Sequence, residues 1–148
     1  MRYKYKIDRD TRTLILKYIR KYKEYKKWYE EERTAICETA ITPKQEDGMP
    51  HGSGKSDITG NSAVRLEKLN NSHKAKVVRA IEKSRAAIGK DLFSHKEREY
   101  LKRAIWLSCL NAKKYPFEAF AGFVAYERRQ FYYYKNKFLN DIKNELDI

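Results

Sequence analysis

The sequence predicts an all-α protein with a long N-terminal helix, a flexible Gly/Pro-rich linker and a helical bundle that ends in a helix-turn-helix. Two observations lead to this fold class. Apolar and aromatic residues recur every three to four positions over most of the chain, which is the period of a helix and not of a strand. Residues 42–61 break this pattern, because they hold four of the six glycines and two of the three prolines. We therefore divide the chain into an N-terminal helix at 1–41, a linker at 42–61 and a helical domain at 62–148.

The first expected element is one helix from about Asp10 to Thr39. Its apolar stripe recurs at intervals of three and four residues, and it consists of Leu14, Tyr18, Tyr22, Tyr25 and Tyr29. Asp8 or Asp10 can accept the free amide hydrogens at its start. Because a single helix cannot bury its own aromatic stripe, we expect this one to pack on the rest of the chain or on a second copy.

The linker at 42–61 reads TPKQEDGMPHGSGKSDITGN and has almost no large apolar side chains. Ordering such a backbone costs conformational entropy that no buried apolar area offsets. We expect a mobile tether between the two helical blocks.

The second block begins at Asn61 or Ser62, either of which can cap a helix. An interruption is expected near residues 70–72, and the helical spacing then continues to Gly89, a typical C-terminal stop. Ser94 and Glu97 form a capping-box pattern in front of a second amphipathic helix that should end near Lys114. The apolar residues of that helix are Leu101, Ile105, Trp106, Cys109 and Leu110.

Three further features complete the expected helix-turn-helix, which spans about 94–146. Pro116 can open a short helix, Gly122 supplies a tight turn, and a final helix follows from about Glu127 to Glu145. The side chains of this last helix that we expect to face inward are Phe131, Tyr134, Phe138 and Ile142. A capped helix, a short helix, a turn and a longer basic helix are the layout of a helix-turn-helix DNA-binding unit.

Composition favours a polyanionic partner. The chain has 148 residues, a formal net charge of +13 and a pI near 9.7, so nucleic acid is the leading partner and an anionic membrane surface the second. No apolar run approaches the length of a membrane span, and the start lacks the apolar core of a signal peptide, so we expect a cytoplasmic protein. Of the two polyanionic partners we expect nucleic acid, and no membrane. We interpret Cys37 and Cys109 as reduced thiols.

The stretch GMPHGSGKSD at 48–57 resembles the end of a phosphate-binding loop, but its spacing is wrong. Such a loop needs a glycine five positions before Gly54, where this chain has Met49, and no strand leads into it. The histidines, His51, His73 and His95, do not pair with cysteines at metal-ligand spacing. We therefore expect no enzymatic activity, no cofactor and no metal.

The positive signal lies at the start of the final helix. Arg128, Arg129 and Gln130 are suited to base contacts, because arginine can donate two bonds to guanine and glutamine can bond adenine in the same way. Tyr132, Tyr133 and Lys135 are suited to positioning the DNA backbone. The residues that we expect on outward faces of the helix are Arg128, Arg129, Tyr132, Lys135 and Asn136. The alternative is that all of these are ordinary surface residues of a bundle helix.

Residues 117–142, FEAFAGFVAYERRQFYYYKNKFLNDI, resemble the C-terminal helix-turn-helix of the RinA/ArpU type of phage late-gene transcription activators. YIRKYKEYKKWYEE at 18–31 and SDITGNSA at 56–63 are similar to the N-terminal helix and the glycine-rich break of that group. Tyr126 stands where the family usually carries a capping serine. The resemblance implies an activator of late genes for packaging, morphogenesis and lysis, with a unit similar to the promoter-binding region of sigma factors.

These observations support three hypotheses. The first is a transcription activator that reads double-stranded promoter DNA and contacts bacterial RNA polymerase, with dimerisation through the N-terminal helix as an option. The second is a structural DNA-handling component such as a small DNA-packaging subunit. The third, an RNA-binding regulator, is disfavoured because the tyrosines follow helical spacing and do not line an exposed sheet.

Overall fold

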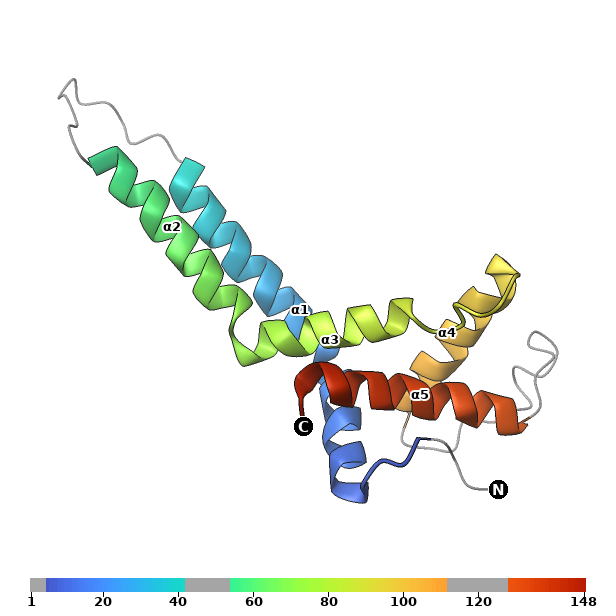
Figure 1. Cartoon of the computed structure of the whole chain (residues 1–148). Coiled ribbons are helices and arrows are strands. Elements are labelled where there is room, and N and C mark those ends of the chain that lie inside the picture. Colours follow the sequence, from blue (N-terminus) through green and yellow to red (C-terminus); the bar gives the residue numbers. More distant parts are fainter. Residues whose placement is uncertain (1–4, 42–53, 112–127) are drawn as a thin grey trace. The chain divides into compact units, whose positions relative to one another are not determined.

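The computed structural model describes residues 5–41, 54–111 and 128–148, except for the side chains of 39–41, 54–59 and 128. Within these ranges the chain is helical and has no strand, so the expected all-α class is confirmed (Figure 1). The helices are α1 (Arg9–Ile41), α2 (Gly54–Asn70), α3 (His73–Ala86), α4 (His95–Leu110) and α5 (Arg128–Leu146). None of them is both long enough and apolar enough to cross a membrane.

The boundaries of α1 follow the sequence closely. The apolar spacing predicts a helix over about 10–39, and α1 extends this range by one residue at its start and two at its end. The backbone amide of Thr11 donates to Oδ2 of Asp8 at 3.4 Å, so Asp8 is the capping residue. At the other expected cap, the amide of Glu97 donates to Oγ of Ser94 at 3.4 Å and α4 starts one residue after Ser94. Both caps satisfy amides that the first helical turn leaves without a backbone partner.

The predicted linker is too long at its C-terminal side. Helix α2 begins at Gly54, so residues 54–61 are helical, and Asn61 and Ser62 lie inside the helix and do not cap its start. The interruption expected near 70–72 is confirmed, since α2 ends at Asn70 and the Ser72 hydroxyl accepts the amide of Ala75 at 3.4 Å at the start of α3. Residues 42–53, with most of the GMPHGSGKSD stretch, lie outside the described residues.

The turn after α3 depends on Gly89. Its φ is +71°, in the left-handed region that glycine adopts without strain, and it follows the last residue of α3 by three positions. A Cβ added at Gly89 would lie 3.2 Å from both Cγ of Arg98 and Cδ1 of Leu92. The position therefore requires glycine for backbone conformation and for close packing, as a helix stop predicts.

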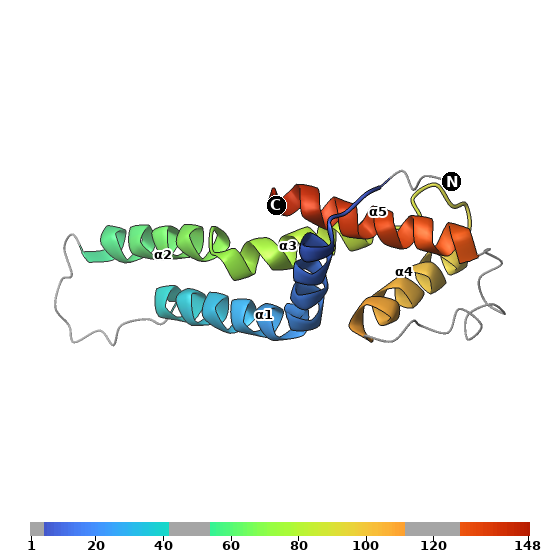
Figure 2. The same cartoon turned by 90° about the horizontal axis from the view of Figure 1, so that it is seen from below.

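The chain divides into two compact units, whose boundary crosses α1 after Tyr22 and α3 after Val78. Unit 2 comprises residues 23–78. In it the second part of α1 and helix α2 run side by side in opposite directions (Figures 1 and 2). Tyr29 donates its hydroxyl to Oδ1 of Asn70 at 2.6 Å, and Nζ of Lys74 lies 4.8 Å from the centre of the Trp28 ring. This unit is a helical hairpin closed by aromatic side chains.

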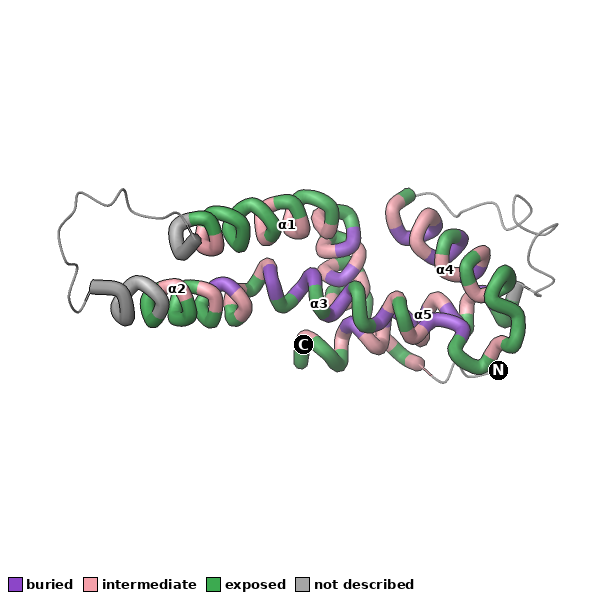
Figure 3. Tube along the Cα trace, turned by 90° about the horizontal axis from the view of Figure 1, so that it is seen from above, coloured by how far each residue is buried: buried purple, intermediate pink, exposed green. Residues whose placement is uncertain are grey.

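Unit 1 comprises residues 1–22 and 79–148. Figure 3 shows buried positions in α1, α3, α4 and α5 within this unit. Its largest fully buried side chains include Ile15 and Ile19 of α1, Ile81 of α3, Leu101 and Ile105 of α4, and Phe138, Leu139 and Ile142 of α5. The four inward residues predicted for α5 are all buried, which confirms the orientation of its apolar face.

Candidate nucleic-acid interface

The two units differ in charge. Unit 1 contains 23 of the 33 basic and 11 of the 20 acidic residues, a net charge of +12, whereas unit 2 has 10 basic and 9 acidic residues, a net charge of +1. Nearly all of the electrostatic attraction for a polyanion therefore belongs to the unit that contains α5.

Helix α5 is positioned by contacts on two of its sides. Its apolar side packs on α4, and Tyr134 donates its hydroxyl to Oδ2 of Asp91 at 2.8 Å. A second side meets the N-terminal part of the chain, where Nη2 of Arg12 donates to Oδ1 of Asn136 at 2.9 Å and the rings of Tyr5 and Tyr133 lie 5.7 Å apart. Together these contacts fix which residues of α5 remain accessible.

The expected outward position of Asn136 is wrong. Asn136 is only 8% exposed, because the Arg12 guanidinium and the start of α1 cover its side of the helix. A helical projection of α5 against a single partner cannot show this second contact side. The role of Asn136 in this structure is to accept the Arg12 hydrogen bond.

Lys135 also turns toward the protein. It is half-buried, and its Nζ donates to Oγ of the buried Ser108 at 2.8 Å. The same ammonium group and Arg12 lie near the buried thiol of Cys109. Burial raises the pKa of Cys109 to about 11, and the two cations oppose this increase. Lys135 is therefore engaged inside unit 1.

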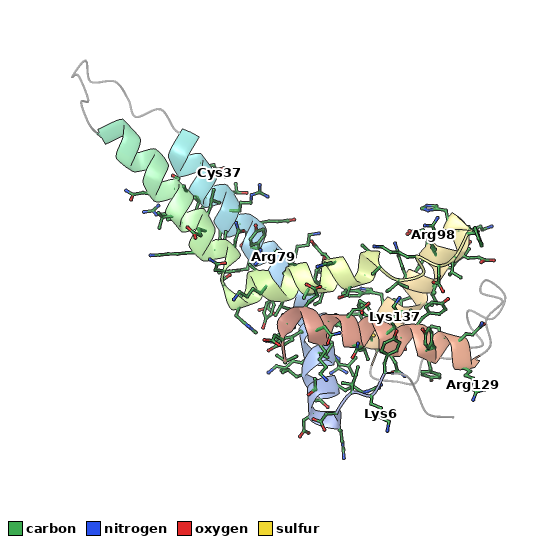
Figure 4. All side chains as sticks on the ribbon, viewed as in Figure 1. Lys6, Cys37, Arg79, Arg98, Arg129 and Lys137 are labelled. Carbon is green, nitrogen blue, oxygen red and sulfur yellow. The ribbon has the colours of Figure 1, made fainter. Side chains whose placement is uncertain are left out.

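Four residues in the first half of α5 lie next to one another on the side away from its apolar face: Arg129, Gln130, Tyr133 and Lys137. Arg129 and Gln130 are exposed, Tyr133 is 38% exposed, and Lys137 is half-buried, as Lys135 is. Arg129, Tyr133 and Lys137 follow one another at intervals of four residues, so they are neighbours along one helical face. In Figure 4 Arg129 lies at the first turn of α5, and its side chain points away from the helix. We call these four residues the α5 outer face.

Lys137 is not among the residues that the sequence singles out, although its spacing from Tyr133 could have shown it. It lies four residues before Asp141, whose pKa is raised by burial and by Glu145 and lowered by Lys137. Because burial has the largest effect, the pKa of Asp141 is above its ordinary value. Asp141 therefore becomes protonated at a higher pH than an exposed carboxylate does.

The remaining candidates are placed as follows. Tyr132 is half-buried, with its ring centre 5.6 Å from that of Phe131 and 5.9 Å from Nζ of Lys135. Arg128 is the first residue of α5, and its side chain lies outside the described residues, as do the expected short helix after Pro116 and the turn at Gly122. The structure thus leaves Arg129 and Gln130 exposed and Tyr133 partly exposed, turns Lys135 toward Ser108, and buries Asn136 under Arg12 on the helical side that also carries Tyr133.

Within the described ranges, no group of three or more histidine, cysteine, aspartate or glutamate side chains could hold a metal ion. Cys37 and Cys109 are both free thiols, as expected. Comparison with known proteins found no matching family model, no matching curated protein and no matching solved structure.

Proposed function

We propose that this chain is a non-enzymatic, sequence-specific DNA-binding protein that activates late genes of a phage or prophage. The observation that carries the DNA-binding part is the α5 outer face in a unit of net charge +12. A helix fixed by contacts on two sides presents its accessible face in one orientation, which is what insertion into a major groove requires.

The residue types on the α5 outer face suit base recognition. Arg129 can donate two hydrogen bonds to O6 and N7 of guanine, and Gln130 can bond N6 and N7 of adenine. Tyr133 and Lys137 have the reach and the donors to bind phosphate oxygens, which would set the register of the helix in the groove. We include Arg128 among the base-contacting residues because it directly precedes Arg129 at the start of α5.

The activator part of the proposal rests on the resemblance of residues 117–142 to late-gene activators of the RinA/ArpU type. An activator also contacts the transcription machinery. Unit 2 has a net charge of +1 and therefore little attraction for DNA. We assign to unit 2 the contact with RNA polymerase or with a second copy of the chain.

Selection from a random pool of duplex DNA tests the proposal and does not require a known operator. The protein should enrich a defined sequence, and that sequence upstream of a reporter gene should raise transcription when the protein is expressed. Failure to enrich any sequence would contradict specific binding. Enrichment without activation would contradict the activator assignment and favour the packaging subunit.

A further inference from the structure

The segment before α1 contacts one residue of the α5 outer face, Tyr133. The Tyr5 ring is 5.7 Å from the Tyr133 ring, with an angle of 49° between their planes. Seven residues further along the chain, Arg12 is bonded to Asn136 on the next turn of α5. Residues 5–12 are thus held to α5 at both ends, by an aromatic contact and by a hydrogen bond.

This double attachment leaves Lys6 accessible. Tyr5 and Ile7 are half-buried, whereas Lys6 between them is exposed, as are Asp8 and Arg9. Alternation of this kind is typical of an extended segment that turns every second side chain toward the protein. Asp8 accepts the Thr11 amide at the start of α1, so its carboxylate is directed to the helix terminus.

Lys6 therefore belongs to the same surface as the α5 outer face. In Figure 4 the side chains of Lys6 and Arg129 extend to the same side of α5, below it in that view. An ammonium group next to a helix that reads bases is suited to a phosphate and not to a base edge, because it is a compact charge without a fixed bonding pattern.

We propose that Lys6, held in place by Tyr5, binds the sugar-phosphate backbone of the duplex that the α5 outer face reads. This inference rests on the proposed function and adds to it a contact from outside the helix-turn-helix. The segment then positions the recognition helix on DNA in addition to packing against it. The contact is electrostatic and independent of base sequence, so it contributes to affinity and not to sequence preference.

The test compares the salt dependence of duplex binding for the wild-type chain and its variants, on the selected duplex and on a scrambled one. Lys6→Ala should lower affinity for both duplexes by the same factor. It should also make the slope of log K against log salt shallower by about 0.9, the value for one phosphate contact. Lys76→Ala, which removes an exposed lysine of unit 2, is the matched control and should leave the slope unchanged.

Two Tyr5 variants test the attachment. Tyr5→Ala removes the ring contact with Tyr133 and should reproduce the loss seen with Lys6→Ala, whereas Tyr5→Phe keeps the ring and should behave like the wild-type chain. An unchanged slope for Lys6→Ala would overturn the inference if Arg129→Ala reduces preference for the selected duplex. Absence of any preference in the wild-type chain would instead overturn the proposed function.

Discussion

Nη2 of Arg12 donates a 2.9 Å hydrogen bond to Oδ1 of Asn136, which ties the first turn of α1 to the middle of α5 across 124 positions of sequence. Asn136 is only 8% exposed, so its amide depends on protein partners. The bond therefore has consequences for stability and for the orientation of the α5 outer face.

Arg12→Ala should lower the free energy of unfolding by about 1–3 kcal/mol, because it leaves the buried Asn136 carbonyl without its donor. Chemical denaturation of the variant against the wild-type chain measures this. The double variant Arg12→Met, Asn136→Leu removes both polar partners and should recover part of the loss. The single variants Arg12→Met and Asn136→Leu complete the cycle, and a double variant whose destabilisation equals the sum of theirs would show that the groups are not coupled.

The core of unit 1 should contribute more to the free energy of unfolding than its surface ion pairs do. Ile81→Ala removes a side chain that is fully buried, and we expect a loss of about 2–5 kcal/mol in the free energy of unfolding.

Lys83→Ala breaks a 2.9 Å ion pair with Glu145 and supplies the comparison. Both side chains are substantially exposed, at 72% and 38%, so the expected loss is only about 0.2–1 kcal/mol. Thermal or denaturant unfolding of the two variants shows which of them loses more stability. A larger loss for Lys83→Ala than for Ile81→Ala would contradict the location of the core.

Cys109 should make stability fall at alkaline pH. Its pKa is raised from 9.0 to about 11 in the folded chain, so the native state disfavours the thiolate that forms readily once the chain unfolds. The contribution is fully present below pH 9 and is lost as the pH rises through about 11. Over this range the free energy of unfolding of the wild-type chain should fall by roughly 1–3 kcal/mol relative to that of Cys109→Ala.

The measurement is a set of unfolding curves for the two proteins between about pH 8 and about pH 11, in steps of about half a unit. Subtracting the curves removes the shared titration of lysines and tyrosines. A difference in stability that stays constant over the whole range would contradict a raised pKa at Cys109.

Lys137 and Lys135 should behave differently although they are two residues apart. Lys137→Ala should make the slope of log K against log salt shallower by about 0.9 and leave stability nearly unchanged. Lys135→Met removes the donor of the 2.8 Å bond to Ser108, so its main effect should be on the free energy of unfolding. Equal slopes for Lys137→Ala and the wild-type chain would remove Lys137 from the interface.

The sequence predicts the helices well where an apolar period and a cap coincide. Asp8 and Ser94 begin their helices as expected, and Phe138 and Ile142 face the core, because these features depend on local spacing. The start of α2 at Gly54 does not follow from the sequence, since glycine and proline content indicates a loop and carries no information on tertiary support for a helix.

The candidate site could be predicted only in part, for a physical reason. Spacing places Arg129 on an outward face of α5, where it is exposed, but it places Lys135 and Asn136 outward as well. It cannot show that Arg12 covers Asn136, or that Ser108 attracts Lys135, because those partners lie 124 and 27 positions away in the sequence. The position of Lys6 beside α5 could not be predicted either, because the two are far apart in the sequence.

The central claim is that the α5 outer face reads duplex DNA. The most direct test is the ratio of affinities for the selected and scrambled duplexes at one fixed salt concentration, measured for the wild-type chain, Arg129→Ala, Gln130→Ala and the control Arg33→Ala. Arg33 is an exposed arginine of unit 2. Each change on α5 should reduce the ratio by roughly 1–3 kcal/mol, about five- to 150-fold, with Arg33→Ala equal to the wild-type chain. An unchanged ratio for both Arg129→Ala and Gln130→Ala, in variants that remain folded, would contradict the account.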